Sequence, residues 1–232
     1  MTEIERRIEA PGRGEPDYAG TTMSEKDVGR ERHRRFVGGL WEDMGKLQLD
    51  FLIQQGLKPD DRFLDIGCGS LRAGVHLVDY LTSGHYYGID VNHDLIRVGY
   101  DHELSDDQRE RLPSKNLRST DRFNADFGVQ FDMAIAQSVF THVSLNQMRL
   151  CLYRAAKVMR PGGRLFATFF ERAPHYPLDG VRGRSYSERN VYWYYRADLR
   201  WVARFSPWEF RYIGDWGHPR GQAMVQYTRL TD

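Results

Sequence analysis

The stretch Arg-Phe-Leu-Asp-Ile-Gly-Cys-Gly-Ser, residues 62–70, is a short apolar run that passes into two closely spaced glycines. The run has the length of a buried strand, and a helical pattern follows it from about Leu71 to Leu81. Glycines at such a turn let the backbone approach a ligand closely, and ligands of open α/β sheets bind at the carboxyl ends of strands. The stretch predicts either a plain strand-to-helix turn or one wall of a ligand site.

An acidic residue ends the next apolar run, about 20 residues beyond the glycines. This residue, Asp90, could accept hydrogen bonds from both hydroxyls of a ribose. Glycine loop and acid together therefore predict a nucleoside-containing cofactor. The spacing differs from the dinucleotide pattern GxGxxG, because Arg72 follows the loop and the next glycine is Gly74. These residues alone leave NAD and S-adenosylmethionine open.

Short apolar runs alternate with helical patterns from residue 40 to residue 170. Strands are expected at 62–67, 85–90, 116–120, 131–137 and 164–170, and helices at 40–56, 71–81, 94–104 and 144–159. This alternation predicts a parallel sheet covered on both faces. Two further runs, 210–215 and 223–229, are joined by a short link and predict an antiparallel pair. The expected fold class is α/β, a doubly wound, mainly parallel sheet with one reversed strand.

Four motifs occur in order between about residues 36 and 170. They read Phe-Leu-Asp-Ile-Gly-Cys-Gly at 63–69, Tyr-Gly-Ile-Asp at 87–90, Phe-Asp-Met-Ala-Ile-Ala-Gln-Ser-Val-Phe-Thr-His at 131–142 and Met-Arg-Pro-Gly-Gly-Arg-Leu at 159–165. The series resembles the successive motifs of the class I S-adenosylmethionine-dependent methyltransferases, which have a Rossmann-like fold. The resemblance implies S-adenosylmethionine as cofactor, methyltransferase activity, and a seven-stranded sheet whose C-terminal strand is antiparallel.

The resemblance also assigns the residues that hold the methionine part of the cofactor. These lie in the loop after the first strand and at the end of the fourth: Asp65, Gly67, Gly69, Ser70, Gln137 and Ser138. Arg72 departs from the family pattern, because small residues are common at this point of the loop. It is either a ligand of the cofactor carboxylate or a surface arginine.

The nucleoside part would be held by the ends of the second and third strands. By resemblance, Asp90 binds the ribose and Val91 lies against the adenine. Thr120 or Asp121 would lie near the adenine amino group, although the third strand is poorly marked.

Two histidines are candidates for catalysis. His142 follows the fourth strand at the carboxyl edge of the sheet, where a histidine can accept a proton near neutral pH; it could equally be a helix-start residue bonded to backbone. His218 lies between the last two strands with Trp216 and Arg220, a combination that a turn does not require. We predict that His142 and His218 flank the acceptor.

Further acceptor contacts are expected on loops. Trp216 and Arg220 would line the acceptor pocket, and His175 and Tyr176, in the loop after the fifth strand, are weaker candidates. The arginines and aromatics of residues 182–204 could cap this pocket, stack RNA bases, or form an ordinary amphipathic helix.

The domain organisation is simple. Residues 1–39 are expected to form a tail and a lid helix, and residues 40–232 one methyltransferase domain with a cap-like insertion at about 171–205. The segment up to about Gly39 is predicted to fold over the cofactor.

Composition narrows the function further. The 232 residues contain 33 Lys+Arg and 32 Asp+Glu, so a net charge of +1 provides no broad field for nucleic acid or anionic membrane. The start is polar and no apolar run reaches the ~20 residues of a membrane helix, so we expect a cytoplasmic protein. Two cysteines without a His/Cys cluster predict neither a disulfide framework nor a metal site.

These features favour O- or N-methylation of a small organic acceptor. RNA or protein methylation is the alternative, and a non-catalytic cofactor-binding subunit is another. A homodimer is left open.

Overall fold

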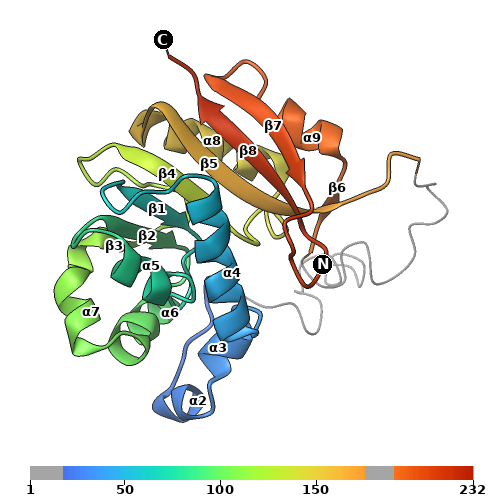
Figure 1. Cartoon of the computed structure of the whole chain (residues 1–232). Helices are drawn as coiled ribbons and strands as arrows, with labels where there is room; N and C mark the ends of the chain where they lie inside the picture. Colours follow the sequence, from blue (N-terminus) through green and yellow to red (C-terminus); the bar gives the residue numbers. More distant parts are fainter. Residues whose placement is uncertain (1–17, 176–190, 232) are drawn as a thin grey trace, which may run out of the picture.

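The computed structural model describes residues 18–175 and 191–231. Its centre is a sheet with strand order β3-β2-β1-β4-β5-β8-β7, and a short strand β6 pairs with the end of β5 (Figure 1). The strands are β1 Phe63–Ile66, β2 Tyr86–Asp90, β3 Leu117–Ser119, β4 Phe131–Ala136, β5 Met159–Glu171, β6 Trp193–Tyr194, β7 Trp208–Gly214 and β8 Ala223–Arg229.

Strand directions place most carboxyl ends at one edge of the sheet. β1 to β5 pair in parallel, whereas β8 is antiparallel to both β5 and β7. β7 therefore runs in the same direction as β1 to β5, and the link from β7 to β8 lies at the edge where the glycine loop begins. The predicted fold class, a mainly parallel seven-stranded path with an antiparallel C-terminal strand, is confirmed.

Helices cover both faces of the sheet (Figure 1). They are α2 Glu25–Gly29, α3 Arg32–Phe36, α4 Trp41–Gln54, α5 Gly74–Tyr80, α6 His93–Val98, α7 Asp106–Arg111, α8 Leu145–Val158 and α9 Arg196–Trp201, with a π-helix, η1, at Gly99–Glu103 and a 3-10 turn, η2, at Ser114–Asn116.

Neighbouring residues of each strand enter opposite cores, as the period of two requires. In β5, Leu165 packs in the core that contains α8, whereas Phe166 packs in the core that contains α4 and α5. Both side chains are fully buried. The apolar strands therefore form the middle layer of three, which explains why they read as nearly continuous hydrophobic runs.

Local chemistry sets several element boundaries. Ser144 caps α8 through a capping box with Gln147. α5 begins at Gly74 rather than near Leu71, because Leu71 has a left-handed backbone with φ of 67° and belongs to the loop. The predicted helix over 94–104 is shorter, since it changes to π geometry where Gly99 lies against the backbone of Ser70.

One interpretation of the C-terminal cap region, an amphipathic helix, holds for only a short part of its described residues. The described part of this region contains β6, which pairs with β5, and then only the short helix α9. The helical spacing of its aromatics therefore indicated a longer helix than the structure has. Tyr176, like the other residues of 176–190, lies outside the described residues.

Two absences hold for the described ranges 18–175 and 191–231. No helix there has both the length and the apolar character needed to cross a membrane. Within the same ranges, His, Cys, Asp and Glu do not gather in any group of three or more that could hold a metal ion.

Candidate active site

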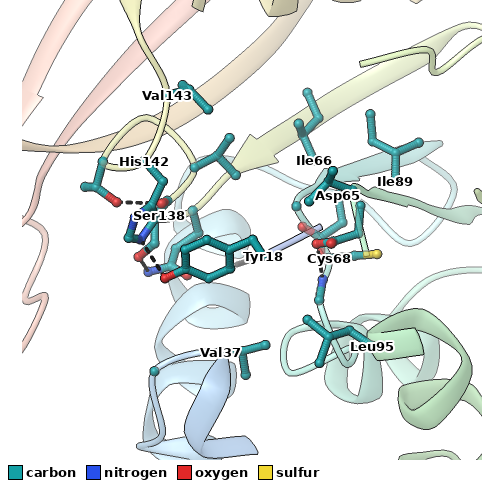
Figure 2. A pocket seen from close by; sticks show the side chains of 18 of the residues that line it. Tyr18, Val37, Asp65, Ile66, Cys68, Ile89, Leu95, Ser138, His142 and Val143 are labelled. Atoms are coloured by element: carbon teal, nitrogen blue, oxygen red, sulfur yellow. Dashed lines mark hydrogen bonds between the residues drawn. The ribbon is translucent and has the colours of Figure 1, made fainter. Parts of the chain in front are cut away.

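A cavity of about 610 Å³ lies at the carboxyl ends of β1, β2 and β4. Figure 2 shows Asp65 and Cys68 on one side of it and Ser138 and His142 on the other. Tyr18, which belongs to the N-terminal segment, lies between the two groups in this view. The cavity therefore lies at the edge where the sequence placed the cofactor. Of the residues predicted to bind the cofactor, those that line it are Asp65, Gly67, Gly69, Arg72, Asp90, Val91, Thr120, Asp121, Gln137 and Ser138.

The glycine loop is closely packed on both sides. Gly67 has a φ of 78°, and a Cβ there would lie 2.4 Å from a methyl group of Val139. Gly69 has a φ of 53°, and its Cβ would lie 2.8 Å from Val37. Both positions require glycine for their backbone angle and for space, so the loop exposes backbone rather than side chains to the cavity.

Asp90 joins the loops that follow β1 and β2. Its two carboxylate oxygens accept hydrogen bonds from the backbone N–H of Gly69 and of Asn92, each at 2.8 Å. Burial raises the pKa of Asp90, and these backbone hydrogen bonds oppose the rise. Each oxygen retains acceptor capacity, because a carboxylate oxygen can accept more than one hydrogen bond.

Asp65 lies deeper in the same site. Its carboxylate accepts a hydrogen bond from the Tyr86 hydroxyl at 2.8 Å, and burial raises its pKa to about 7. The pKa of this carboxyl group is therefore well above that of an ordinary aspartate.

Arg72 is buried, so the interpretation as a surface arginine is wrong. Its Nη1 donates to the carbonyl oxygens of Val37 and Gly39 at 2.9 and 3.1 Å, and its Nη2 donates to Gln137 Oε1 at 2.7 Å. Its Nε is buried without a hydrogen-bond partner among the described residues. Burial lowers the pKa of Arg72 to about 10, so the group remains a cation at neutral pH.

A polar network supports the end of β4. Ser138 has a left-handed backbone with φ of 60°, and its N–H donates to Thr168 Oγ1 at 2.7 Å. Gln222 Oε1 accepts from Thr168 Oγ1 at 2.6 Å, and Gln222 Nε2 donates to Ser138 Oγ at 2.9 Å. Ser138 and Gln222 both line the cavity, so the network fixes polar groups at its wall.

His142 lies in the loop between β4 and α8 and lines the cavity. Its Nε2 is 3.4 Å from the Tyr18 hydroxyl, and the two rings are 4.8 Å apart between centroids (Figure 2). Tyr18 was not anticipated from the sequence. It lies in a segment whose glycines and prolines predict no regular element, so no periodic pattern marks it.

Residues 18–39, here called the strap, are tied to the site at several points. The buried Asn92 side chain donates to the carbonyl oxygens of Tyr18 and Thr21, both at 2.8 Å, and Met23 N–H donates to Asp94 at 2.7 Å. Farther along, Arg34 forms two hydrogen bonds of 2.8 Å with Glu103. The strap thus contacts the loop that follows Asp90.

The link between β7 and β8 does not expose all its predicted residues to the cavity. Arg220 lines it, whereas Trp216 packs against Phe51 at 5.3 Å between ring centroids. His218 is buried, and burial lowers its pKa to about 4, so it is a weak base. The cavity lining does not include His218, which lies beside Gln137 with 3.3 Å between the two Nε2 atoms.

Two more predicted residues lie apart from the cavity. Ser70 is buried, with a hydroxyl that has no partner in the described ranges, and it does not line the cavity. His175 is exposed and also absent from the lining.

Known proteins resemble this chain in sequence and in fold. A family model described as a methyltransferase domain matches residues 64–165. Magnesium protoporphyrin IX methyltransferase from Synechocystis, solved with bound S-adenosylmethionine, aligns with a TM-score of 0.59 at 15% identity over 98% of this chain and 91% of that one.

Two other solved structures align over most of both chains. An S-adenosylmethionine-dependent methyltransferase from Clostridium acetobutylicum gives a TM-score of 0.63 at 10% identity over 90% of this chain and 100% of that one. CalS10 from Micromonospora echinaspora, an amino pentose methyltransferase, gives a TM-score of 0.57 at 18% identity over 90% of this chain and 98% of that one. At such identities the likeness shows the fold.

The matched domain and the fold agree with the methyltransferase family that the sequence motifs resemble. Residues 64–165 therefore form a methyltransferase domain, which lies within a Rossmann-like fold.

Proposed function

We propose that this protein transfers the methyl group of S-adenosylmethionine to a small organic acceptor. The observation that carries the proposal is the single cavity wall formed by the glycine loop, Asp90 and the buried Arg72. The glycine loop suits a methionine moiety bound by backbone, Asp90 suits a ribose, and Arg72 suits the carboxylate of the cofactor.

The residues present fit the cofactor. Asp90 keeps acceptor capacity for ribose hydroxyls, and the unpartnered Nε of Arg72 is a donor suited to a carboxylate. Val91, Thr120 and Asp121 line the part of the cavity proposed for the adenine. S-adenosylmethionine supplies an activated methyl group on a sulfonium, so the chain itself has to orient the acceptor, exclude water and, where needed, accept a proton.

His142 is the residue proposed to accept that proton. It lies at the cavity wall, and the Tyr18 hydroxyl lies 3.4 Å from its Nε2. His218, although predicted as its partner, is proposed instead to support the link that carries Arg220, whose backbone N–H donates to His218 Nδ1 at 3.1 Å.

A small acceptor, rather than RNA or protein, is favoured by the lining. Beyond the residues proposed for the cofactor, the wall contains apolar and aromatic groups that include Phe123, Val143, Phe170 and Val191. O- and N-methylation both remain compatible with a proton acceptor at His142. The test is turnover: the isolated protein, given S-adenosylmethionine and a panel of phenols, amines and carboxylic acids, should release S-adenosylhomocysteine with at least one of them. Release with RNA or protein alone would contradict the proposal.

The strap is proposed to be a lid over the cofactor, as the sequence predicted. Because Asn92 and Asp94 hold the strap next to Asp90, cofactor binding should slow tryptic cleavage at Arg30, Arg32, Arg34 and Arg35. With S-adenosylhomocysteine at 100 times its Kd, the slowing can reach about 100-fold. Cleavage at Arg204, far from the strap in sequence, is the internal control. Equal rates with and without S-adenosylhomocysteine would leave the segment a tail.

A further inference from the structure

Two guanidinium groups converge on Gly38 at the cavity. Arg220 Nη2 donates to the Gly38 carbonyl oxygen at 2.6 Å, while Arg72 binds the carbonyls of Val37 and Gly39 on either side. A Cβ built on Gly38 would lie 3.1 Å from Arg220 Nη1 and 3.7 Å from Arg72 Nη1. The two cations are therefore neighbours that line one cavity.

Among the described residues, no carboxylate contacts either cation. Within residues 18–175 and 191–231, ion pairs do occur for other arginines, such as Arg34 with Glu103 and Arg196 with Glu171, but not for Arg72 or Arg220. Asp65 acts on Arg72 only through its field, and that carboxyl is held by Tyr86 with a pKa raised to about 7. Adjacent like charges without a counter-ion are unfavourable. The cofactor carboxylate proposed for Arg72 would offset one of the two charges, and a second anion at Arg220 would offset the other.

Hydrogen bonds from its backbone and its side chain hold Arg220 in place. Its backbone N–H donates to Nδ1 of the buried His218. Burial and the two nearby arginines keep His218 neutral at physiological pH, which leaves a ring nitrogen able to accept that hydrogen bond. Because the hairpin tip and the Gly38 carbonyl both hold Arg220, part of the entropy cost of ordering a long side chain is met before a ligand arrives.

The charges around the cavity are divided between its two parts. The acidic residues in its lining are Asp65, Asp90 and Asp121, all on the side proposed for the cofactor. Among the described lining residues that the proposed function leaves for the acceptor, Arg220 is the charged group, and Val143, Phe170 and Val191 are apolar side chains. Such a wall suits an apolar or aromatic molecule with one anionic end.

We propose that Arg220, backed by Arg72, forms a subsite for a carboxylate of the acceptor. This inference rests on the proposed function and adds to it the chemical class of the acceptor: an apolar or aromatic compound that carries a carboxylate as a binding handle. The atom that receives the methyl group is then the one that faces His142, at another point of the same cavity.

The test uses two probes of equal shape and different charge, benzoate and benzamide, titrated into the full-length protein. The titrations are done with the protein saturated either with S-adenosylhomocysteine or with 5′-methylthioadenosine, which lacks the methionine carboxylate. In both complexes benzoate should bind about tenfold or more tightly than benzamide, the usual worth of a charge-assisted contact.

Variants at one position define the contact. Arg220→Gln should remove the preference for benzoate, Arg220→Lys should keep part of it, and neither should change the affinity for S-adenosylhomocysteine by more than about threefold. Arg211→Gln is the matched control, since Arg211 is an exposed arginine of β7 outside the cavity lining. Arg220 is itself exposed, so its replacement should leave thermal unfolding unchanged, which checks that the variants are folded.

Three results would overturn the inference in distinguishable ways. Equal affinity for benzoate and benzamide, or a preference that survives Arg220→Gln, would mean that no such subsite exists. Benzoate binding that S-adenosylhomocysteine blocks and 5′-methylthioadenosine permits, together with weaker S-adenosylhomocysteine binding by Arg220→Gln, would assign the subsite to the cofactor carboxylate. Failure to bind S-adenosylhomocysteine at all would instead contradict the proposed function.

Discussion

Replacing His142 by alanine should lower the turnover of an acceptor that must lose a proton by about 100-fold to 10,000-fold, while S-adenosylmethionine still binds. The reason is positional: the imidazole lies at the cavity wall after β4, and the Tyr18 hydroxyl lies 3.4 Å from its Nε2. The measurement is the initial rate of S-adenosylhomocysteine release as a function of pH, with the affinity for S-adenosylhomocysteine determined separately by calorimetry.

His102→Ala is the matched control, because His102 is an exposed histidine in η1 and does not line the cavity. It should leave both the rate and the affinity unchanged. If His142→Ala costs less than about tenfold and the rate has no titration between about pH 6 and 7, His142 is not the base. The methylated group would then be one that arrives deprotonated, and His142 would act only in positioning.

Replacing Asp90 by alanine should weaken the binding of S-adenosylhomocysteine by about 1.5 to 3 kcal/mol, or about 10-fold to 150-fold. The carboxylate is proposed to bind the ribose, and it also holds the backbone N–H groups of Gly69 and Asn92. Both losses act in the same direction. Calorimetric titration of each variant measures the change.

Two further variants separate these contributions. Asp90→Asn keeps an oxygen acceptor and should lose less affinity than Asp90→Ala. Asp215→Ala removes an exposed aspartate outside the cavity lining and should lose none. Unchanged affinity in Asp90→Ala would require a different ligand for the ribose.

Features within one strand and its following loop could be predicted from the sequence. The glycines of 67 and 69 were predicted to approach a ligand closely, and their positive φ values and tight contacts agree with a backbone-lined wall. Asp90 ends β2 as expected, and Ser144 caps α8. In each case the signal lies in residues that are adjacent in the chain, although the tight contacts of the two glycines come from the distant Val139 and Val37.

Features that depend on distant contacts were not predictable. Arg72 is buried because carbonyl oxygens of Val37 and Gly39, far upstream, accept its hydrogen bonds. His218 is placed beside Gln137 by the packing of the hairpin, and topology alone could only place it at the correct edge of the sheet. Tyr18 is held at the cavity because the Asn92 side chain donates a hydrogen bond to its carbonyl oxygen, and no local sequence pattern predicts this contact.

The cap region shows a different limit. Its aromatics recur at roughly helical spacing, yet Trp193 and Tyr194 pair with β5 as a short strand. Trp193 stacks on Phe170 at 4.8 Å between ring centroids. Pairing with the end of β5 therefore outweighed the helical pattern of the sequence, as tertiary contacts commonly do.

Binding of cofactor analogues to the wild-type protein tests the central claim most directly. Calorimetric titration with S-adenosylhomocysteine should show saturable binding to one site per chain, and titration with NAD under the same conditions should show none. The account would be contradicted if S-adenosylhomocysteine gave no binding heat at about millimolar concentration, where a Kd corresponds to a binding free energy of about −4 kcal/mol. Tighter binding of NAD than of S-adenosylhomocysteine would contradict it as well.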